Sequence, residues 1–75
     1  MQNTKKQIEF LLSNNMEVNI YNENYDVKND RGNLIVVCNL NGYTAPLDDS
    51  EIQECYASKW YVREYEELKG FRVYP

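Results

Sequence analysis

A chain of 75 residues with 12 acidic and 8 basic side chains, a net charge of −4 and no histidine has room for one small domain. Without histidine it lacks the commonest general base and the commonest metal ligand, and two cysteines alone cannot complete a four-sulfur zinc site. The acidic balance also disfavours sequence-independent binding to duplex DNA, which depends on lysine and arginine contacts to phosphates.

The first predicted element is an amphipathic helix. Thr4-Lys5-Lys6-Gln7 has the form of a capping box, in which both side chains bond backbone N–H groups at the helix start. Ile8, Leu11 and Leu12 follow at the spacing of one helical face, and Ser13-Asn14-Asn15 is a plausible end because asparagine tolerates a left-handed C-cap. A helix this short is not stable alone in water, so its apolar face must pack on another element.

Strands follow the helix. Met16, Val18 and Ile20 alternate with polar residues, which predicts a half-buried strand whose remaining side chains, Asn19 among them, face away from the core. Tyr25 and Val27 repeat the alternation more weakly. The segment 34–40 is the most apolar run of the chain and is predicted to be a central strand.

Turn residues separate these strands. Asn29-Asp30-Arg31-Gly32 predicts a turn in which the glycine takes a positive φ. Asn41-Gly42 is typical of a two-residue type I′ hairpin turn. The returning strand, 43–47, is predicted to lie at a sheet edge, because Pro46 has no N–H to donate.

The last third of the chain has two readings. Ser50-x-x-Gln53 is a second capping-box pattern, which favours a short helix near 49–57 followed by an aromatic strand at 60–65 and a hairpin that returns through 71–74. The alternative is one helix over 50–69. We favour strands because the segment is rich in aromatic residues and valine.

The expected fold is therefore α+β, with residues 1–75 as a single small domain. One N-terminal amphipathic helix packs on an antiparallel sheet of about four to five strands, with a possible second short helix near 49–57. Because the apolar core is thin, a homodimer formed through the 43–47 edge strand is one possible way to complete it.

Nothing in the sequence supports catalysis, a cofactor or a metal site. In Asp26–Gly32, the stretch closest to a calcium loop, Lys28 and Arg31 stand where a ligand oxygen and the glycine are needed. Cys38 falls in the apolar run and should be a core residue, and Cys55 lies beside Glu54, whose charge disfavours a thiolate. We expect a protein that is not an enzyme.

No apolar run approaches the length of about 20 residues that crosses a bilayer, and no signal peptide is evident. The expected location is the cytoplasm, where both cysteines would be reduced thiols, and no membrane partner is expected.

Tyrosine is the unusual feature of the composition, with seven copies in 75 residues. Tyrosine suits interfaces because it buries a large rigid surface yet tolerates water. Tyr21, Tyr25, Tyr43, Tyr61 and Tyr65 are expected to lie mostly opposite the core, beside acidic residues that would steer the chain toward a basic host protein. The residues predicted to bind this partner are Tyr61, Tyr65, Glu64, Glu66, Glu67, Asp48, Asp49, Glu51 and Glu54.

In size and composition the chain resembles the accessory proteins that phages and mobile elements encode, such as anti-CRISPR and anti-restriction inhibitors. The resemblance implies an inhibitor or adaptor of a nucleic-acid-binding host protein. The alternative is a single-stranded nucleic-acid binder that stacks bases on Trp60, Tyr61 and Tyr65, although residues 59–74 carry a net charge of only +1.

Overall fold

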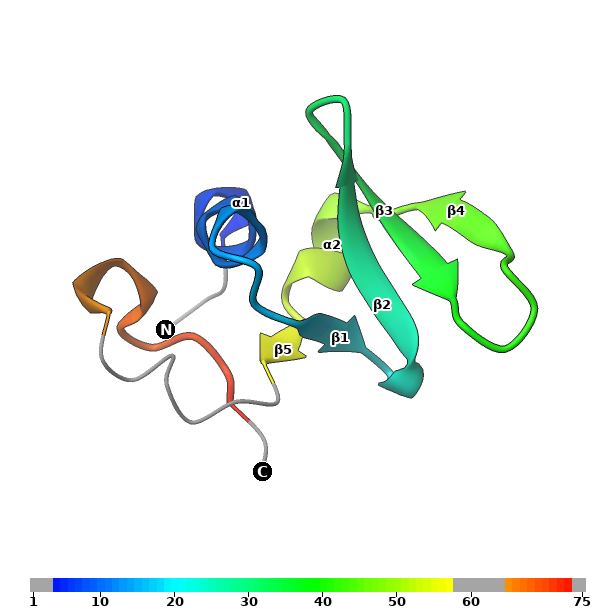
Figure 1. Ribbon diagram of the computed structural model, residues 1–75. Helices are drawn as coiled ribbons and strands as arrows, with labels where there is room; N and C mark the ends of the chain where they lie inside the picture. The colour runs from blue at the N-terminus through cyan, green and yellow to red at the C-terminus, as the bar shows by residue number, and fades with distance from the viewer. Residues whose placement is uncertain (1–3, 58–64, 74–75) are drawn as a thin grey trace.

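The computed structural model describes residues 4–57 and 65–73 and has an α+β fold (Figure 1). All five strands pair antiparallel in one sheet with the order β4-β3-β2-β1-β5. The predicted class is confirmed. In chain order the elements are α1 (Lys5–Ser13), β1 (Val18–Ile20), β2 (Asn22–Asp30), β3 (Asn33–Cys38), β4 (Thr44–Pro46), α2 (Asp49–Ile52), β5 (Tyr56–Ala57) and the 3₁₀ turn η2 (Glu66–Leu68).

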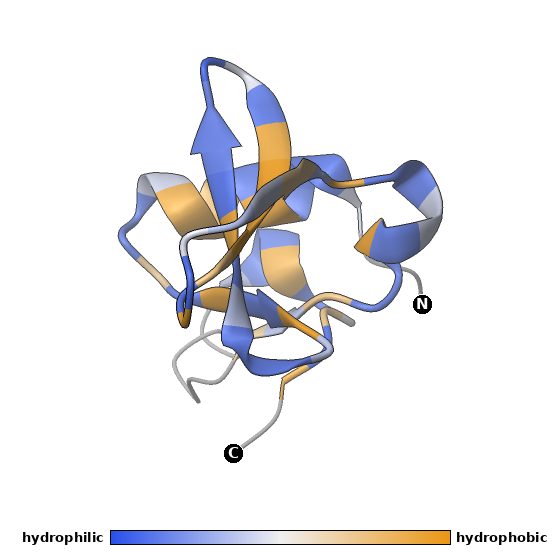
Figure 2. Cartoon of the chain, turned by 90° about the vertical axis from the view of Figure 1, so that its right-hand side faces the viewer, coloured by the Kyte–Doolittle hydropathy of each residue, from blue (hydrophilic) through white to orange (hydrophobic). Residues whose placement is uncertain are grey.

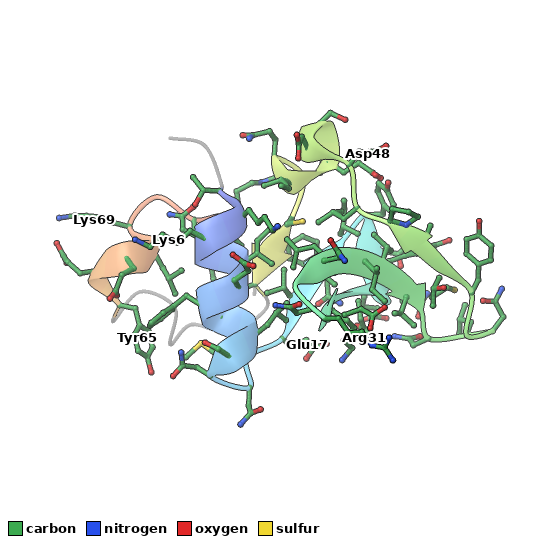
Figure 3. All side chains as sticks on the ribbon, turned by 90° about the horizontal axis from the view of Figure 1, so that it is seen from above. Lys6, Glu17, Arg31, Asp48, Tyr65 and Lys69 are labelled. Carbon is green, nitrogen blue, oxygen red and sulfur yellow. The ribbon has the colours of Figure 1, made fainter. Side chains whose placement is uncertain are left out.

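Helix α1 begins with the predicted capping box. The Gln7 N–H donates to Thr4 Oγ1 at 3.2 Å, and the Thr4 N–H donates to Gln7 Oε1 at 2.8 Å. Ile8 and Leu11 of its apolar face are fully buried. The helix ends as predicted, with Asn15 in the left-handed region at a φ of 60°. Figures 1 and 3 place α1 between η2 on one side and the sheet on the other.

Strands β2 and β3 form the longest pairing, with Val27 opposite Val36, which is itself opposite Ala45 of β4. The turn between them lies where the sequence predicts it. Both turn residues are left-handed, Arg31 at a φ of 53° and Gly32 at 88°. Strand β3 is paired by β2 on one side and β4 on the other, so it is a central strand, as predicted.

The predicted two-residue turn at Asn41-Gly42 is wrong. The Cys38 N–H donates to the Tyr43 carbonyl at 2.8 Å, so four residues, 39–42, separate the bonded pair in place of two. Of the Asn41-Gly42 pair only Gly42 has a positive φ, whereas a type I′ turn needs two. Leu40 lies in the loop between β3 and β4 and not in a strand, and it is 75% exposed. Strand β4 lies at the sheet edge, as Pro46 predicts.

The second helix begins at Asp49, as predicted, but it ends at Ile52 and is shorter than the predicted 49–57. The Asp48 N–H donates to Glu51 Oε1 at 3.0 Å, so Asp48 and not Ser50 caps α2. The chain leaves the helix after Ile52 and joins the sheet as β5, which excludes one helix over 50–69. The predicted strand at 60–65 lies outside the described residues except for Tyr65.

The C-terminal segment completes the core. Residues predicted as a hairpin loop form η2 instead, with Leu68 buried beside Phe71. Val73 forms a parallel bridge with Ala57 of β5. Figure 2 shows apolar segments interspersed with polar ones along the chain, and the buried apolar residues form one core cluster. The buried core residues are Ile8, Leu11, Val18, Ile20, Val27, Leu34, Val36, Ile52, Cys55, Ala57, Leu68 and Phe71.

Strand β1 is buried on both faces, which corrects the half-buried strand expected from its alternation. Asn19, predicted to face away from the core, is 1% exposed, and β2 and β5 pair with its strand on either side. Its Nδ2 donates to Asp26 Oδ1 at 2.9 Å and to the Tyr25 carbonyl at 3.2 Å. These bonds satisfy the amide donor in a place where water cannot reach it.

Replacing Asn19 therefore tests the sheet. We expect Asn19→Ala to lower the free energy of unfolding by about 1–3 kcal/mol, because two acceptors lose a buried donor. Asn39→Ala is the matched control: its Nδ2 donates to the Glu23 carbonyl at 3.1 Å, but the residue is exposed. Urea denaturation of both variants checks the difference, and equal losses would contradict a special role for Asn19.

Candidate functional site

Three tyrosines and one carboxylate line a small groove at the end of the sheet near α2. Its volume is about 140 Å³. Apolar cavities on the order of 150 Å³ hold a benzene-sized group, so the groove has room for one side chain. We call it the tyrosine groove, and its lining residues are Tyr21, Tyr25, Val36, Cys38, Tyr43, Ala45, Pro46 and Glu51.

Strand register builds the floor of the groove. Tyr25 lies opposite Cys38, and Val36 lies opposite Ala45, so these side chains share one face of three neighbouring strands. Small side chains on β3 and β4 leave a hollow beside the large ring of Tyr25. The groove therefore lies on the same face of the sheet as the core, at the end of that face where Cys38 and Ala45 are the small residues beside Tyr25.

The other two tyrosines come from the ends of strands. Tyr21 lies between β1 and β2 with a φ of 68°, and this left-handed backbone turns the chain from one strand into the next. Its ring lies edge-on to that of Tyr25, with the centroids 5.5 Å apart. Tyr43 immediately precedes β4. Tyr21 is 59% exposed and Tyr43 is 68% exposed, so both rings present most of their surface to solvent.

Glu51 brings a negative charge to this aromatic groove. Its Oε2 accepts a hydrogen bond from the Tyr21 hydroxyl, and its Oε1 accepts the bond from the Asp48 N–H that caps α2. Because both oxygens are held, the carboxylate is fixed at the groove before any partner arrives. Asp48 and Asp49 are exposed beside it, and acids at this helix start are also stabilised by the helix dipole.

The predicted partner-binding acids fall into two separate groups. Asp48, Asp49, Glu51 and Glu54 gather on and next to α2, whereas Glu66 and Glu67 are exposed on η2. In Figure 3, Asp48 lies at the start of α2, while Lys69 and Tyr65 lie on the far side of α1. The two acidic segments therefore do not form one continuous surface.

Tyr65 is half-buried. Its ring packs edge-on against Phe10 of α1, with the centroids 5.4 Å apart, so part of its surface already supports the helix. Tyr61, Glu64 and Trp60 lie outside the described residues. Whether these aromatic residues bind a partner stays a prediction.

The sequence named Tyr21, Tyr25 and Tyr43 as surface tyrosines but did not group them as a site. Tyr25 lies on the core-facing side of β2 beside Val27, which corrects the expectation that it faces away. The one clue in the sequence was that Tyr21 and Tyr43 each lie next to the end of a strand, where side chains of neighbouring strands can meet. Only the pairing register of the strands shows that these tyrosines lie together.

A second and wider hollow runs between the end of α1 and β2. Its volume is about 600 Å³, and Glu9, Glu17, Asp26 and Lys28 lie among its lining residues. The charges are mixed in sign and the walls are largely polar. This hollow selects no ligand chemistry as clearly as the tyrosine groove does.

Neither cysteine has the surroundings of a nucleophile. Cys55 is fully buried, and its Sγ donates to the Glu51 carbonyl at 3.6 Å. Burial, with a smaller contribution from the negative charge of Glu51, raises the pKa of the Cys55 thiol to about 12. Cys38 is buried as predicted, at 7% exposure.

Within residues 4–57 and 65–73, no group of three or more cysteine and acidic side chains is arranged to hold a metal ion. In the same part of the chain, no helix has the length and apolar character needed to cross a membrane. No protein-family model, curated protein or solved structure matches the chain.

The buried thiol gives a prediction for pH. Unfolded chains lose the Cys55 proton above a pKa of 9.0, while the folded chain holds it to about 12. The raised pKa therefore stabilises the fold fully below pH 9, and this contribution is lost as the pH rises toward 12. We expect the stability difference between the native chain and Cys55→Ala to be smaller at pH 10.5 than at pH 7.5 in urea denaturation. A difference that grows with pH would contradict the raised pKa.

Proposed function

We propose that this chain is a non-enzymatic binding protein that docks on a basic surface of another protein. The tyrosine groove and the acidic residues of α2 form the docking face. The single observation that carries the proposal is Glu51, a carboxylate held among aromatic rings by bonds from the Tyr21 hydroxyl and the Asp48 N–H. Glu51 caps α2 through one oxygen, and a fixed charge beside exposed rings is also suited to recognising a cationic partner.

Exposed apolar surface supports this proposal. Tyr21, Tyr43 and Leu40 are the large apolar side chains that remain mostly exposed among the described residues, and all three lie at this end of the sheet or in its β3–β4 loop. In a chain with few apolar residues, leaving these outside the core costs stability that burial in a complex would recover. Tyrosines and neighbouring apolar residues are the usual anchors of such interfaces.

The negative charge near the groove indicates that the partner surface is basic. Asp48 and Asp49 are exposed at the start of the helix that carries Glu51, whereas Glu54 is ion-paired with Arg72 at 3.5 Å. No basic side chain is among the lining residues of the groove in the part of the chain that the structure describes. An acidic face accelerates encounter with a basic partner and repels phosphate groups. The proposal therefore favours a basic protein over a nucleic acid as the direct partner.

A nucleic-acid-binding groove of a host protein is one such basic surface. A small acidic protein that covers it competes with the nucleic acid and inhibits the host protein, in the manner of anti-CRISPR and anti-restriction inhibitors. This finer proposal rests on charge and size. It requires that the complex with the host protein and the complex with nucleic acid exclude each other.

The test is capture of a basic partner from host lysate at 50 mM salt, followed by kinetics with the purified partner. We expect the association rate to fall as salt is added, because exposed charges are screened. Tyr43→Ala should weaken the complex by about 1–2 kcal/mol, since a ring at the centre of the contact is lost. Asp49→Asn should slow association.

Glu66→Gln is the matched control, since it removes one charge on the far side of α1. It tests at the same time whether the η2 acids take part, as the sequence predicts. If Glu66→Gln weakens the complex and Tyr43→Ala does not, the docking face is wrongly placed. Direct binding of a labelled oligonucleotide to the native chain would favour the nucleic-acid alternative instead.

A further inference from the structure

We propose that the tyrosine groove receives one arginine side chain of the partner, with its guanidinium paired to Glu51 and lying against the tyrosine rings. This inference rests on the proposed function and names the chemistry that the same site recognises. The groove is sized for a single side chain, at about 140 Å³. A strand or a helix would not enter it.

The floor of the groove suits the stem of such a side chain. Val36, Cys38 and Ala45 provide an apolar surface along which methylene groups can be buried while the charged end stays near the rim. The rings of Tyr21 and Tyr25 meet edge to face, which covers one face of one ring, so the exposed ring of Tyr43 is the more open aromatic surface beside that path. A cation within about 6 Å of a ring centroid is attracted by the negative face of the ring.

Glu51 gives the groove its preference for a cation. Each carboxylate oxygen has two lone pairs, and each accepts one hydrogen bond within the chain, from the Tyr21 hydroxyl and from the Asp48 N–H. One acceptor site on each oxygen therefore remains for the two parallel N–H donors of a guanidinium. The carboxylate loses little freedom on binding because it is already held.

Other occupants fit less well. A neutral apolar side chain would remove water from Glu51 without neutralising it, which is costly. A lysine ammonium would satisfy the charge, but it lacks the planar fork that matches a carboxylate and stacks on a ring. A phosphate group would meet the negative charges of Glu51, Asp48 and Asp49.

The experiment is a titration of the native chain with N-acetyl-arginine amide, followed through the NMR signals of the tyrosine rings. N-acetyl-citrulline amide is the matched probe, because it has nearly the same shape and no charge. We expect shifts at Tyr21, Tyr25 and Tyr43, with a Kd on the order of millimolar for so small a ligand. Citrulline amide should bind at least about fivefold more weakly, as a charged pair is lost.

Two variants identify the groups responsible. Glu51→Gln should weaken arginine amide by roughly fivefold or more, and it preserves the cap of α2 because glutamine also serves in a capping box. Glu66→Gln removes the same charge from η2, on the far side of α1 and outside the groove, and it should change the Kd less than about twofold. Tyr43→Leu, at an exposed position, should weaken arginine amide while thermal unfolding stays unchanged.

Equal binding of citrulline amide, or no shift at the three rings, overturns the arginine proposal. If capture of a basic protein still depends on Tyr43 in that case, the proposed function stands with a different occupant of the groove. If no basic protein binds either, the proposed function fails as well.

Discussion

The buried amide of Asn19 is the constraint on which the sheet depends. Asn19 is paired with Asp26 of β2 and with Tyr56 of β5, so one residue joins the two halves of the sheet. Its side chain is enclosed and needs acceptors, which it finds only on β2. Because the buried amide must reach acceptors on β2, it can be satisfied in only one register between β1 and β2. An apolar residue at this position would allow the two strands to pair in a shifted register.

The register between β1 and β2 also determines where the residues of the tyrosine groove lie. The pairing shifts at Asn19 and Ile20, and the chain then turns sharply at Tyr21, whose backbone is left-handed. This turn directs the Tyr21 hydroxyl toward Glu51 on α2, thirty positions later in the chain. A strand buried for structural reasons therefore sets the position of the first ring of the candidate site.

Features that depend on neighbouring residues were predictable from the sequence. Features that depend on pairing between strands distant in the sequence were not. The capping box of Thr4 and Gln7 was found because all its atoms lie within one turn of helix. The second cap was misplaced because Ser50 and Asp48 both head the required pattern. The structure selects Asp48, since a helix running on to Ala57 would remove the strand that pairs with Val18 and Asn19.

For the same reason, only part of the candidate site could be predicted from the sequence. The acidic segment at α2 is contiguous in sequence and was named, but Tyr21, Tyr25 and Tyr43 meet only through the β1–β2 corner and the β3–β4 pairing. The Asn41-Gly42 signal favoured a tight turn, and the pairing of Cys38 with Tyr43 enlarged it. That larger loop places Tyr43 at the groove and carries Leu40 into solvent.

The two edges of the sheet are protected in different ways. The Ala57 N–H donates to the Arg72 carbonyl at 3.0 Å, so the C-terminal segment covers β5. On β4, the bonds of Tyr43 and Leu47 to β3 direct the backbone groups of Thr44 and Pro46 outward. Pro46 has no N–H, which leaves Thr44 as the one outward donor of this strand. A second chain therefore meets an edge with few outward donors, which disfavours growth of the sheet strand by strand beside the exposed aromatic rings; the homodimer through 43–47 stays a prediction.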